Sequence, residues 1–253
     1  MATDRAGCRS GTVFSGKLSS EVLSSTVAVF SSTRVGPVRS ACDIIGLRRI
    51  RDCGMTFRDV RNLKKQIRRT ALSRRDDQQH KDELSARIVG AFMSLPEYAT
   101  ASSVMFYIDV RSEVRTRQFL PDALHSGKTI VVPWCNDRGE LELFRLAGLD
   151  ELETGRYQIP EPRENLRNLP DKQVSLEEPD VIIVPGIGFD VRGGRVGSGR
   201  GYYDKLLKHV RTDTQIIALA FECQMLDEIP VAEHDVLMDK VITEDRIYPG
   251  QGR

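Results

Sequence analysis

The stretch Val181-Ile182-Ile183-Val184, followed directly by a glycine-rich turn, constrains the fold more than any other part of the chain. These four residues are apolar on both faces, as a central strand of a parallel sheet requires, because helices cover both of its sides. The glycine-rich turn leads into a segment with helical character at about 201–210. A strand that runs through such a turn into a helix is typical of an α/β sheet that binds a ligand at its carboxyl edge.

Further apolar segments continue this alternation of strands and helices. Helical spacing predicts a first helix around 60–71 and a second one that is capped by Ser73 and ends near Leu95, just before Pro96. The remaining expectations are a short helix at 117–125 that stops at Gly127, a long loop at 154–179, and strands at 104–108, 129–132 (closed by Pro133), 141–146, 215–221 and 240–243. This order predicts a single α/β domain with three layers, in which a mostly parallel sheet has helices on both faces, as in sugar-phosphate isomerases and coenzyme A transferases.

Residues 1–55 differ in composition from the rest of the chain. They hold nine serines and eight Lys/Arg against four Asp/Glu, and they show no sustained hydrophobic period. This composition fits an organellar transit peptide, or a start codon assigned too early with Met55 as the true beginning, and we favour the second interpretation. In either case we expect a disordered, dispensable leader, with the domain at residues 56–253.

The overall composition disfavours several classes of protein. The formal net charge is +1, which gives no electrostatic reason to expect nucleic acid or an anionic membrane as a partner. The five cysteines are scattered and form no C-x-x-C pair, which disfavours a disulfide framework or structural zinc and favours a reducing compartment. There is no run of eighteen apolar residues, so we expect no membrane span. These observations favour a cytoplasmic protein without nucleic-acid or membrane partners. We expect a monomer that acts on small molecules, although none of these observations determines the oligomeric state.

The segment from Pro185 to Asp204 has the clearest chemistry. Its alternate glycines from 197 to 201 let the backbone approach an anion closely, and the helix that follows directs N–H groups toward that anion. Arg195 and Arg200 can add charge-assisted contacts to phosphate oxygens. The spacing matches neither a Walker loop nor a Rossmann fingerprint, so on spacing alone a tight strand–helix turn is an equally good interpretation.

The whole string is more specific than the glycine spacing. P-G-x-G-F-D at 185–190 and G-x-R-x-G-x-G-x-G-Y-Y-D at 193–204 closely resemble the signature of the 5-formyltetrahydrofolate cyclo-ligase family. Other features of that family occur here in the same order: K-x-x-x-R (Lys64 and Arg68), E-V-x-T at 113–116, I-P-x-P at 159–162, P-x-x-x-x-D at 230–235, and an acidic residue, Asp239, before the last strand. The resemblance covers residues 58–248, and it supports the α/β fold expected from the pattern.

The resemblance implies an enzyme that is an ATP-dependent ligase. Members of the family convert 5-formyltetrahydrofolate into 5,10-methenyltetrahydrofolate and release ADP and phosphate, with ATP as co-substrate and Mg²⁺ as cofactor. Transfer of the γ-phosphoryl group to the formyl oxygen turns a poor leaving group into a good one, and N10 then closes the ring. The protein mainly has to position two substrates and neutralise charge on the transferring group.

The resemblance also implies roles for single residues. The residues implied in ATP binding are Lys64, Lys65, Arg68, Arg195, Val196, Gly197, Ser198, Gly199, Arg200, Gly201, Tyr202 and Tyr203. Those implied in folate binding are Arg68, Glu113, Ser198, Gly199, Arg200, Gly201 and Tyr202, and those implied in catalysis are Arg68, Arg195, Arg200 and Tyr202. Asp204 and Asp235 would bind Mg²⁺, which takes one or two carboxylates besides phosphate oxygens and water. Four aromatic residues could stack on the folate, although we favour a structural role for each: Phe106, Tyr107, Trp134 and Tyr157.

Two other functions remain open. An enzyme for sugar phosphates or coenzyme A thioesters could use a related three-layer sheet, and it would not need the pair Asp204 and Asp235. A non-catalytic regulator could bind folate or nucleotide without turnover. Two departures from the family pattern concern the site itself: position 200 is Arg where the family often has Lys or Gly, and residues 109–112 are more highly charged than the usual loop.

Overall fold

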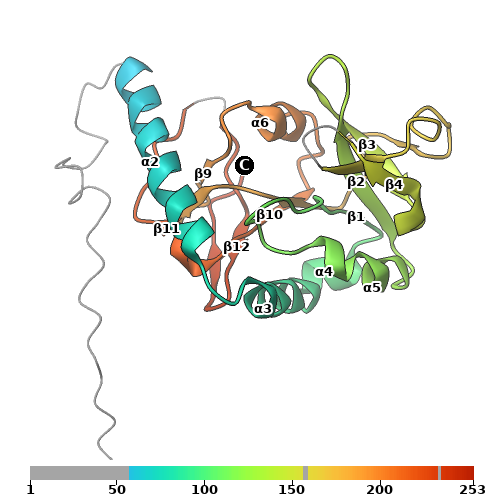
Figure 1. The fold of residues 1–253 in the computed structure, drawn as a ribbon, viewed down its shortest axis with the longest axis horizontal. Helices are drawn as coiled ribbons and strands as arrows, with labels where there is room; N and C mark the ends of the chain where they lie inside the picture. The colour runs from blue at the N-terminus through green and yellow to red at the C-terminus, as the bar shows by residue number, and fades with distance from the viewer. Residues whose placement is uncertain (1–56, 156–158, 233–234) are drawn as a thin grey trace, which may run out of the picture. The chain divides into compact units, whose positions relative to one another are not determined.

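The computed structural model describes residues 57–155, 159–232 and 235–253 (Figure 1). The predicted leader and Tyr157 lie outside the described residues. No helix in the described part of the chain is both long and apolar enough to cross a lipid bilayer.

An eight-stranded sheet forms the centre of the domain. In spatial order its strands are β13 (Ile247–Pro249), β12 (Lys240–Ile242), β10 (Gln215–Leu219), β7 (Val181–Val184), β1 (Ser103–Met105), β2 (Thr129–Cys135), β3 (Leu141–Leu146) and β6 (Gln173–Val174). The pairs from β12 through β10, β7 and β1 to β2 are parallel, whereas β13, β3 and β6 pair antiparallel at the two sides. The prediction of a mostly parallel sheet with 181–184 as a central strand is therefore confirmed.

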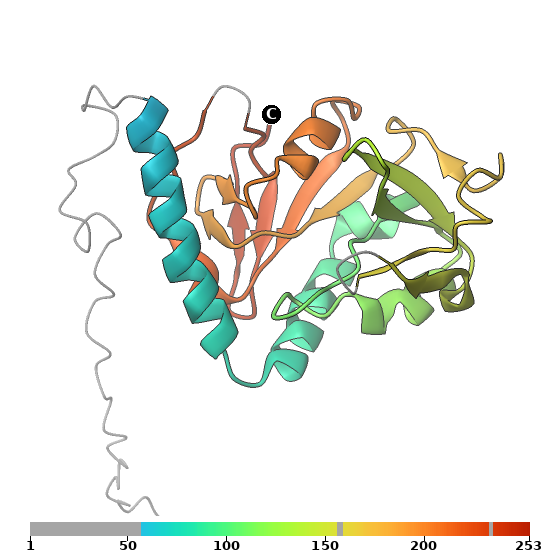
Figure 2. The same ribbon diagram turned by 45° about the horizontal axis from the view of Figure 1, so that its top comes forward.

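Helices cover both faces of this sheet, as predicted (Figures 1 and 2). On one face lie α3 (Lys81–Met93), α4 (Pro96–Thr100), the 3-10 turn η2 (Arg117–Phe119) and α5 (Leu120–Leu124), and on the other lies α6 (Tyr202–Leu207). Successive residues of β7 belong to different cores: Val181 and Ile183 pack with α3, whereas Ile182 and Val184 pack with α6. A strand buried on both sides is what its uninterrupted apolar sequence predicts.

The first helix, α2 (Phe57–Asp77), packs beside a second, smaller sheet (Figure 2). That sheet has the order β11 (Met225–Leu226), β8 (Gly188–Asp190), β9 (Arg195–Val196). The helix buries Leu63 and Ile67 against Val196, Leu226 and Ile229. Because β9 leads directly into the glycine-rich turn, this packing places α2 alongside the segment that the sequence singled out.

Some predicted boundaries were wrong. Ser73 does not cap a second helix, because α2 continues through it to Asp77, and α3 begins after His80 instead. The buried stripe of α2 extends through Ala71 and Arg75, and the burial of these two side chains keeps the chain helical beyond Ser73. Strand β2 likewise continues through Pro133, because it pairs only with β3 beyond Val131 and a proline is tolerated where one side of a strand is unpaired.

Other differences from the predicted boundaries are smaller. Helix α6 ends at Leu207, so it is shorter than predicted. The expected loop at 154–179 contains two short strands, β6 and β5 (Pro160–Pro162), and β5 pairs with β4 (Leu152–Thr154) after the short 3-10 turn η3 (Leu149–Glu151). A further 3-10 turn, η5 (Glu222–Gln224), follows β10. None of these differences moves the glycine-rich turn from the carboxyl edge of the parallel strands.

Candidate active site

The glycine-rich turn links β9 to α6 at the carboxyl edge of the sheet. Gly199 and Gly201 have φ angles of 95° and 70°, in the left-handed region that side chains disfavour. Gly201 occupies the N-cap position of α6. Ser198, Gly199 and Arg200 are exposed, whereas Val196 is buried and anchors the turn. Residues 198–200 are therefore accessible to a ligand, and binding of phosphate by this turn stays a prediction.

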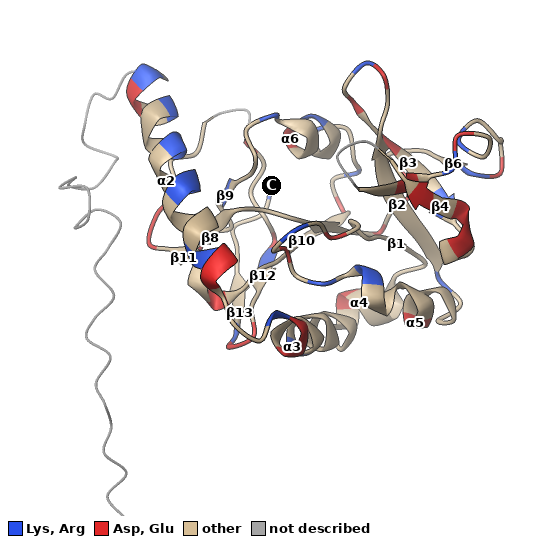
Figure 3. Cartoon of the chain, viewed as in Figure 1, with Lys and Arg blue, Asp and Glu red and all other residues tan. Residues whose placement is uncertain are grey.

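Helix α2 brings cations to this turn from more than a hundred residues away in the sequence (Figure 3). The Arg68 Nε donates a hydrogen bond to the Gly197 carbonyl oxygen at 2.8 Å. One turn earlier, Lys64 forms an ion pair with Asp235, and both side chains are largely buried. Burial lowers the pKa of Arg68, while the charges of Asp235 and Asp204 act to raise it. Two of the residues predicted from K-x-x-x-R thus lie together with both predicted metal ligands.

Arg195 forms the inner wall of the same site. Its Nη2 lies 2.6 Å from the Asp204 carboxylate, its side chain is only 6% exposed, and its guanidinium carbon lies 5.7 Å from the centre of the Tyr203 ring. Its buried Nε has no hydrogen-bond partner among the described residues. A buried donor without a partner is costly, so this N–H lacks a compensating hydrogen bond within the described residues.

Arg200 and Tyr202 lie on the outer side of the turn. The Arg200 Nη1 donates to the Tyr202 hydroxyl at 3.2 Å, and Arg200 is exposed. A Cβ on Gly139, in the turn between β2 and β3, would lie 3.9 Å from the Tyr202 ring, so the β2–β3 turn borders this side. Lys65 is exposed on α2, and its predicted contact with ATP remains a prediction.

The donor set fits Mg²⁺ only together with a phosphate ligand. Asp204 pairs with Arg195 and Asp235 pairs with Lys64, so each predicted metal ligand already faces a cation. The described residues contain no group of three or more His, Cys, Asp or Glu side chains placed to hold a metal ion. Mg²⁺ is commonly held by one or two carboxylates, with phosphate oxygens and waters completing the octahedron. Asp204 and Asp235 are compatible with that mode and not with an all-protein cage.

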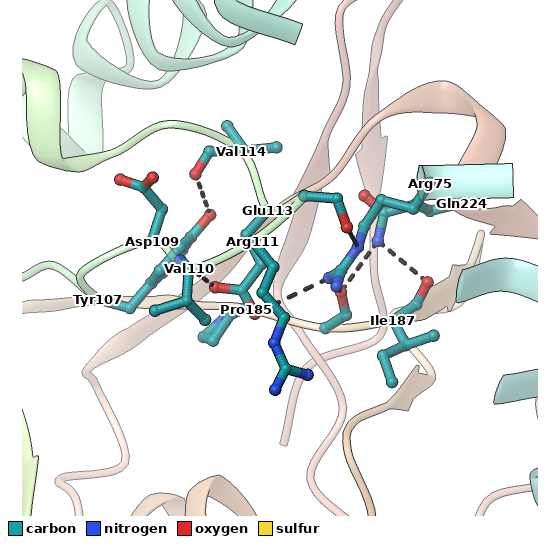
Figure 4. Close-up of polar contacts among 12 residues, drawn as sticks. Arg75, Tyr107, Asp109, Val110, Arg111, Glu113, Val114, Pro185, Ile187 and Gln224 are labelled. Carbon is teal, nitrogen blue, oxygen red and sulfur yellow. Dashed lines mark hydrogen bonds and ion pairs between the residues drawn. The ribbon is translucent and has the colours of Figure 1, made fainter. Parts of the chain in front are cut away.

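A second part of the site follows β1 (Figure 4). The Glu113 carboxylate accepts a hydrogen bond from the Val110 N–H at 3.1 Å and lies 3.8 Å from the Arg75 Nη1. Burial raises the pKa of Glu113, although the charge of Arg75 acts in the opposite direction. Burial, with the charge of Glu113, also raises the pKa of Tyr203 on α6. Glu113 and Tyr203 are therefore close enough to interact electrostatically, which links the loop after β1 to α6.

Thr116 and Tyr107 fix the loop that carries Glu113. The Thr116 hydroxyl donates to the Tyr107 carbonyl oxygen at 2.6 Å, and the Tyr107 hydroxyl donates to the Val114 carbonyl oxygen at 3.1 Å. Tyr107 and Phe106 are buried in the core, which agrees with the structural role favoured for them. Trp134 is half-buried, with the Arg167 guanidinium 4.6 Å from its ring centre.

Two acidic residues of the motifs have structural roles. The buried Asp190 of P-G-x-G-F-D accepts hydrogen bonds from the N–H groups of Arg192, Gly194 and Ile229, at 2.9, 2.8 and 2.8 Å. Asp239 accepts one from the Ile216 N–H at 2.7 Å, which ties the segment before β12 to β10. Their presence in the motifs therefore reflects how the turns are held.

Sequence reasoning missed Arg75 and Gln224. Arg75 is 4% exposed and donates to the Gly186 carbonyl oxygen at 3.0 Å, and the Gln224 Nε2 donates to the same oxygen at 2.9 Å. The signal for Arg75 was its place four residues after Ala71 on the buried stripe of α2. The signal for Gln224 is absent from the sequence pattern, because the residue reaches Gly186 from a separate 3-10 turn.

Comparison with known proteins places this geometry in context. The model of the 5-formyltetrahydrofolate cyclo-ligase family matches residues 54–244. The 5-formyltetrahydrofolate cyclo-ligase of Mus musculus is 31% identical over 157 residues, which cover 59% of this chain and 76% of the mouse protein. The protein of that name from Escherichia coli K12 is 27% identical over 184 residues, with 72% and 97% covered. The NMR structure of Aquifex aeolicus 5,10-methenyltetrahydrofolate synthetase superposes with a TM-score of 0.66 at 30% identity, covering 76% of this chain and 95% of that one.

Proposed function

The chain belongs to the 5-formyltetrahydrofolate cyclo-ligase family, and from this premise we propose that it converts 5-formyltetrahydrofolate into 5,10-methenyltetrahydrofolate at the expense of ATP. The observation that carries the proposal for this site is the contact of Arg68 with the Gly197 carbonyl oxygen. It joins a cationic helix to a glycine-rich turn that is open to phosphate, and both substrates could meet there.

The reaction explains why the site needs several cations. A formamide oxygen is a poor leaving group because amide resonance strengthens its bond to carbon. Transfer of the γ-phosphoryl group from ATP to that oxygen releases ADP and gives an iminium phosphate. N10 then attacks the formyl carbon and loses its proton, the bond from this carbon to the phosphorylated oxygen breaks, and phosphate leaves as the ring closes. Phosphoryl transfer requires alignment of the two substrates and neutralisation of the charge on the transferring group.

We assign the nucleotide to the glycine-rich turn. The backbone N–H groups at 197–201 would bind phosphate oxygens, with Arg195 and Arg68 donating charge-assisted hydrogen bonds to them. Lys64 would contact the nucleotide from α2, one turn before Arg68. Mg²⁺, bound with ATP by Asp204 and Asp235, would supply further neutralisation of the phosphate charge.

We assign the folate to the space beside Glu113. An ionised carboxylate accepts hydrogen bonds only, and the pteridine edge offers N–H donors that need an acceptor. Glu113 lies on the loop after β1 and acts electrostatically on Tyr203 of α6. This arrangement supports a folate that extends from the Glu113 loop toward the glycine-rich turn, with its formyl group near Arg68.

The test is direct turnover. Purified protein mixed with 5-formyltetrahydrofolate, Mg²⁺ and ATP should develop the near-ultraviolet absorbance of methenyltetrahydrofolate, and it should release one phosphate per product. Omission of ATP should abolish the signal. Binding of both ligands without product would favour the regulator, and turnover of a sugar phosphate or a coenzyme A thioester without folate turnover would favour the second enzyme class.

We also propose a monomer that acts in the cytoplasm through the domain at residues 56–253, with no nucleic-acid or membrane partner. The near-neutral charge supports the absence of nucleic-acid and membrane partners, and the scattered cysteines support a reducing compartment. Size-exclusion chromatography with light scattering tests the oligomeric state. Sequencing of the mature N-terminus of the native protein tests the domain start and a targeting role for residues 1–55.

A further inference from the structure

We infer that Arg75 is a positioning residue that holds the Glu113 carboxylate in place for the folate, an inference that rests on the proposed function. Arg75 lies near the end of α2, with its side chain buried beneath the loop after β1 (Figure 4). It does not line the glycine-rich turn, so it would act on the reaction through Glu113.

The guanidinium of Arg75 connects three separate segments. Its Nε donates to the Ser112 hydroxyl at 3.1 Å, and its Nη1 donates to the Gly186 carbonyl oxygen at 3.0 Å. The same Nη1 lies 3.8 Å from the Glu113 carboxylate. The Ser112 hydroxyl in turn donates to the Asp76 carboxylate, which also belongs to α2. Arg75 thus fixes the loop after β1 relative to α2 and to the turn that leaves β7.

The burial of Arg75 argues for a specific role of its charge. A side chain that is 4% exposed and carries a fixed positive charge is unfavourable unless it is paired and hydrogen-bonded. A packed apolar residue at this position of the α2 stripe would avoid the free-energy cost of burying a charge. The chain instead places a cation where it acts on Glu113, and the fork of the guanidinium suits the simultaneous contacts that it makes.

Arg75 lies on the same side of α2 as the two cations near the glycine-rich turn. Lys64, Arg68 and Arg75 are four and seven residues apart, so they lie near one face of the helix, spread over about three turns and about 16 Å. The first two contact Asp235 and the glycine-rich turn, and the third contacts the Glu113 loop. One rigid helix would therefore set the distance between the nucleotide and the folate.

The charges around Glu113 determine how removal of the Arg75 charge should change the pH profile. The charged and titratable groups near it are Arg75 on α2, Asp109 and Arg111 on its own loop, Tyr203 on α6, and Tyr107 in the segment after β1. The charges of Arg75 and Arg111 lower the pKa of Glu113, whereas that of Asp109 raises it. Loss of the Arg75 charge should raise this pKa further. As the pH falls, Glu113 would then become protonated, and folate binding would weaken, at a higher pH than in the wild type.

The test is a double-mutant cycle with Arg75→Met and Glu113→Gln, read as KM for 5-formyltetrahydrofolate and KM for ATP. We expect Arg75→Met to raise the KM for folate about tenfold, the size of one charge-assisted hydrogen bond, with little change in the KM for ATP. In the Glu113→Gln background, Arg75→Met should add almost nothing, because the group through which it acts has lost its charge. The acid limb of kcat/KM for folate should also shift to higher pH in Arg75→Met.

Arg69→Met is the matched control, because Arg69 is an exposed arginine on the same helix. It should leave both KM values and the pH profile unchanged. If Arg75→Met does not fold, Arg75→Lys carries the same cycle, because lysine cannot keep the contacts with Ser112 and Gly186 together. It should raise the KM for folate only where Glu113 is intact.

Equal effects of the Arg75 variant in both backgrounds, or equal increases in the two KM values, would overturn the inference and leave Arg75 a purely structural residue. Such a result requires a wild-type protein that turns over, so it would not touch the proposed function. A wild type that forms no methenyltetrahydrofolate would instead overturn the proposed function, and the role of Arg75 with it.

Discussion

The glycine-rich turn can be tested by adding a single methyl group to it. Gly199 has a φ angle of 95°, where an L-residue such as alanine is strained by about 1–2 kcal/mol. A Cβ at this position would lie 3.4 Å from the Arg68 guanidinium carbon, on the surface where we place phosphate. Gly199→Ala should therefore affect both the stability of the domain and the binding of ATP.

The control for the backbone strain is Gly127→Ala. Gly127 has a φ angle of 78°, a Cβ there would meet no atom within 4 Å, and it lies before β2 at the opposite edge of the sheet. Both variants should lose about 1–2 kcal/mol, which lowers the melting temperature of a domain of this size by about 2–8 °C. Only Gly199→Ala should raise the KM for ATP, about tenfold, because the methyl group would lie against the Arg68 guanidinium and block close approach of the phosphate.

The assay is ATP-dependent formation of methenyltetrahydrofolate at saturating folate, with thermal unfolding measured on the same samples. Similar melting temperatures for the two variants would show that the backbone cost is matched. A KM for ATP in Gly199→Ala equal to that of Gly127→Ala would then refute the assignment of the nucleotide to this turn.

Three other substitutions test single contacts. Asp204→Asn should reduce turnover at least tenfold at saturating Mg²⁺ and lower the unfolding free energy by about 1–2 kcal/mol, because the buried Arg195 loses its charged partner; a wild-type rate would remove Asp204 from the metal site. Lys64→Ala should raise the KM for ATP more than that for folate, and the reverse order would contradict its placement beside the nucleotide. Burial raises the pKa of Glu113, so its contribution to stability is complete below the ordinary glutamate pKa and is lost as pH rises through the raised value. Glu113→Gln should therefore gain melting temperature relative to the wild type between acid and neutral pH while it loses turnover, and a difference that does not vary with pH would contradict this account.

Part of the site could be predicted from the sequence. Glycines in the left-handed region at 199 and 201 have a local cause, because the turn itself requires them, and they can be read from their spacing. The position of Arg75 could have been inferred from the α2 stripe, but its pairing with Glu113 could not, because the two lie on segments that only the packed core brings together. Asp190 and Asp239 belong to the family motifs, and only the structure shows what they do, because both accept hydrogen bonds from backbone N–H groups of other segments.

Local pattern by itself determined the central strand at 181–184, the turn that follows it and the alternation of helices and strands, because hydrophobic period and glycine placement act over a few neighbouring residues. Tertiary structure alone decided that α2 continues past Ser73 and that β2 continues through Pro133, since burial and strand pairing override local propensity. It also decided that Lys64 meets Asp235 and that Arg68 meets Gly197. Polar groups far apart in the chain interact only once the fold brings them together. The packed domain, rather than the spacing of its residues, therefore creates the site.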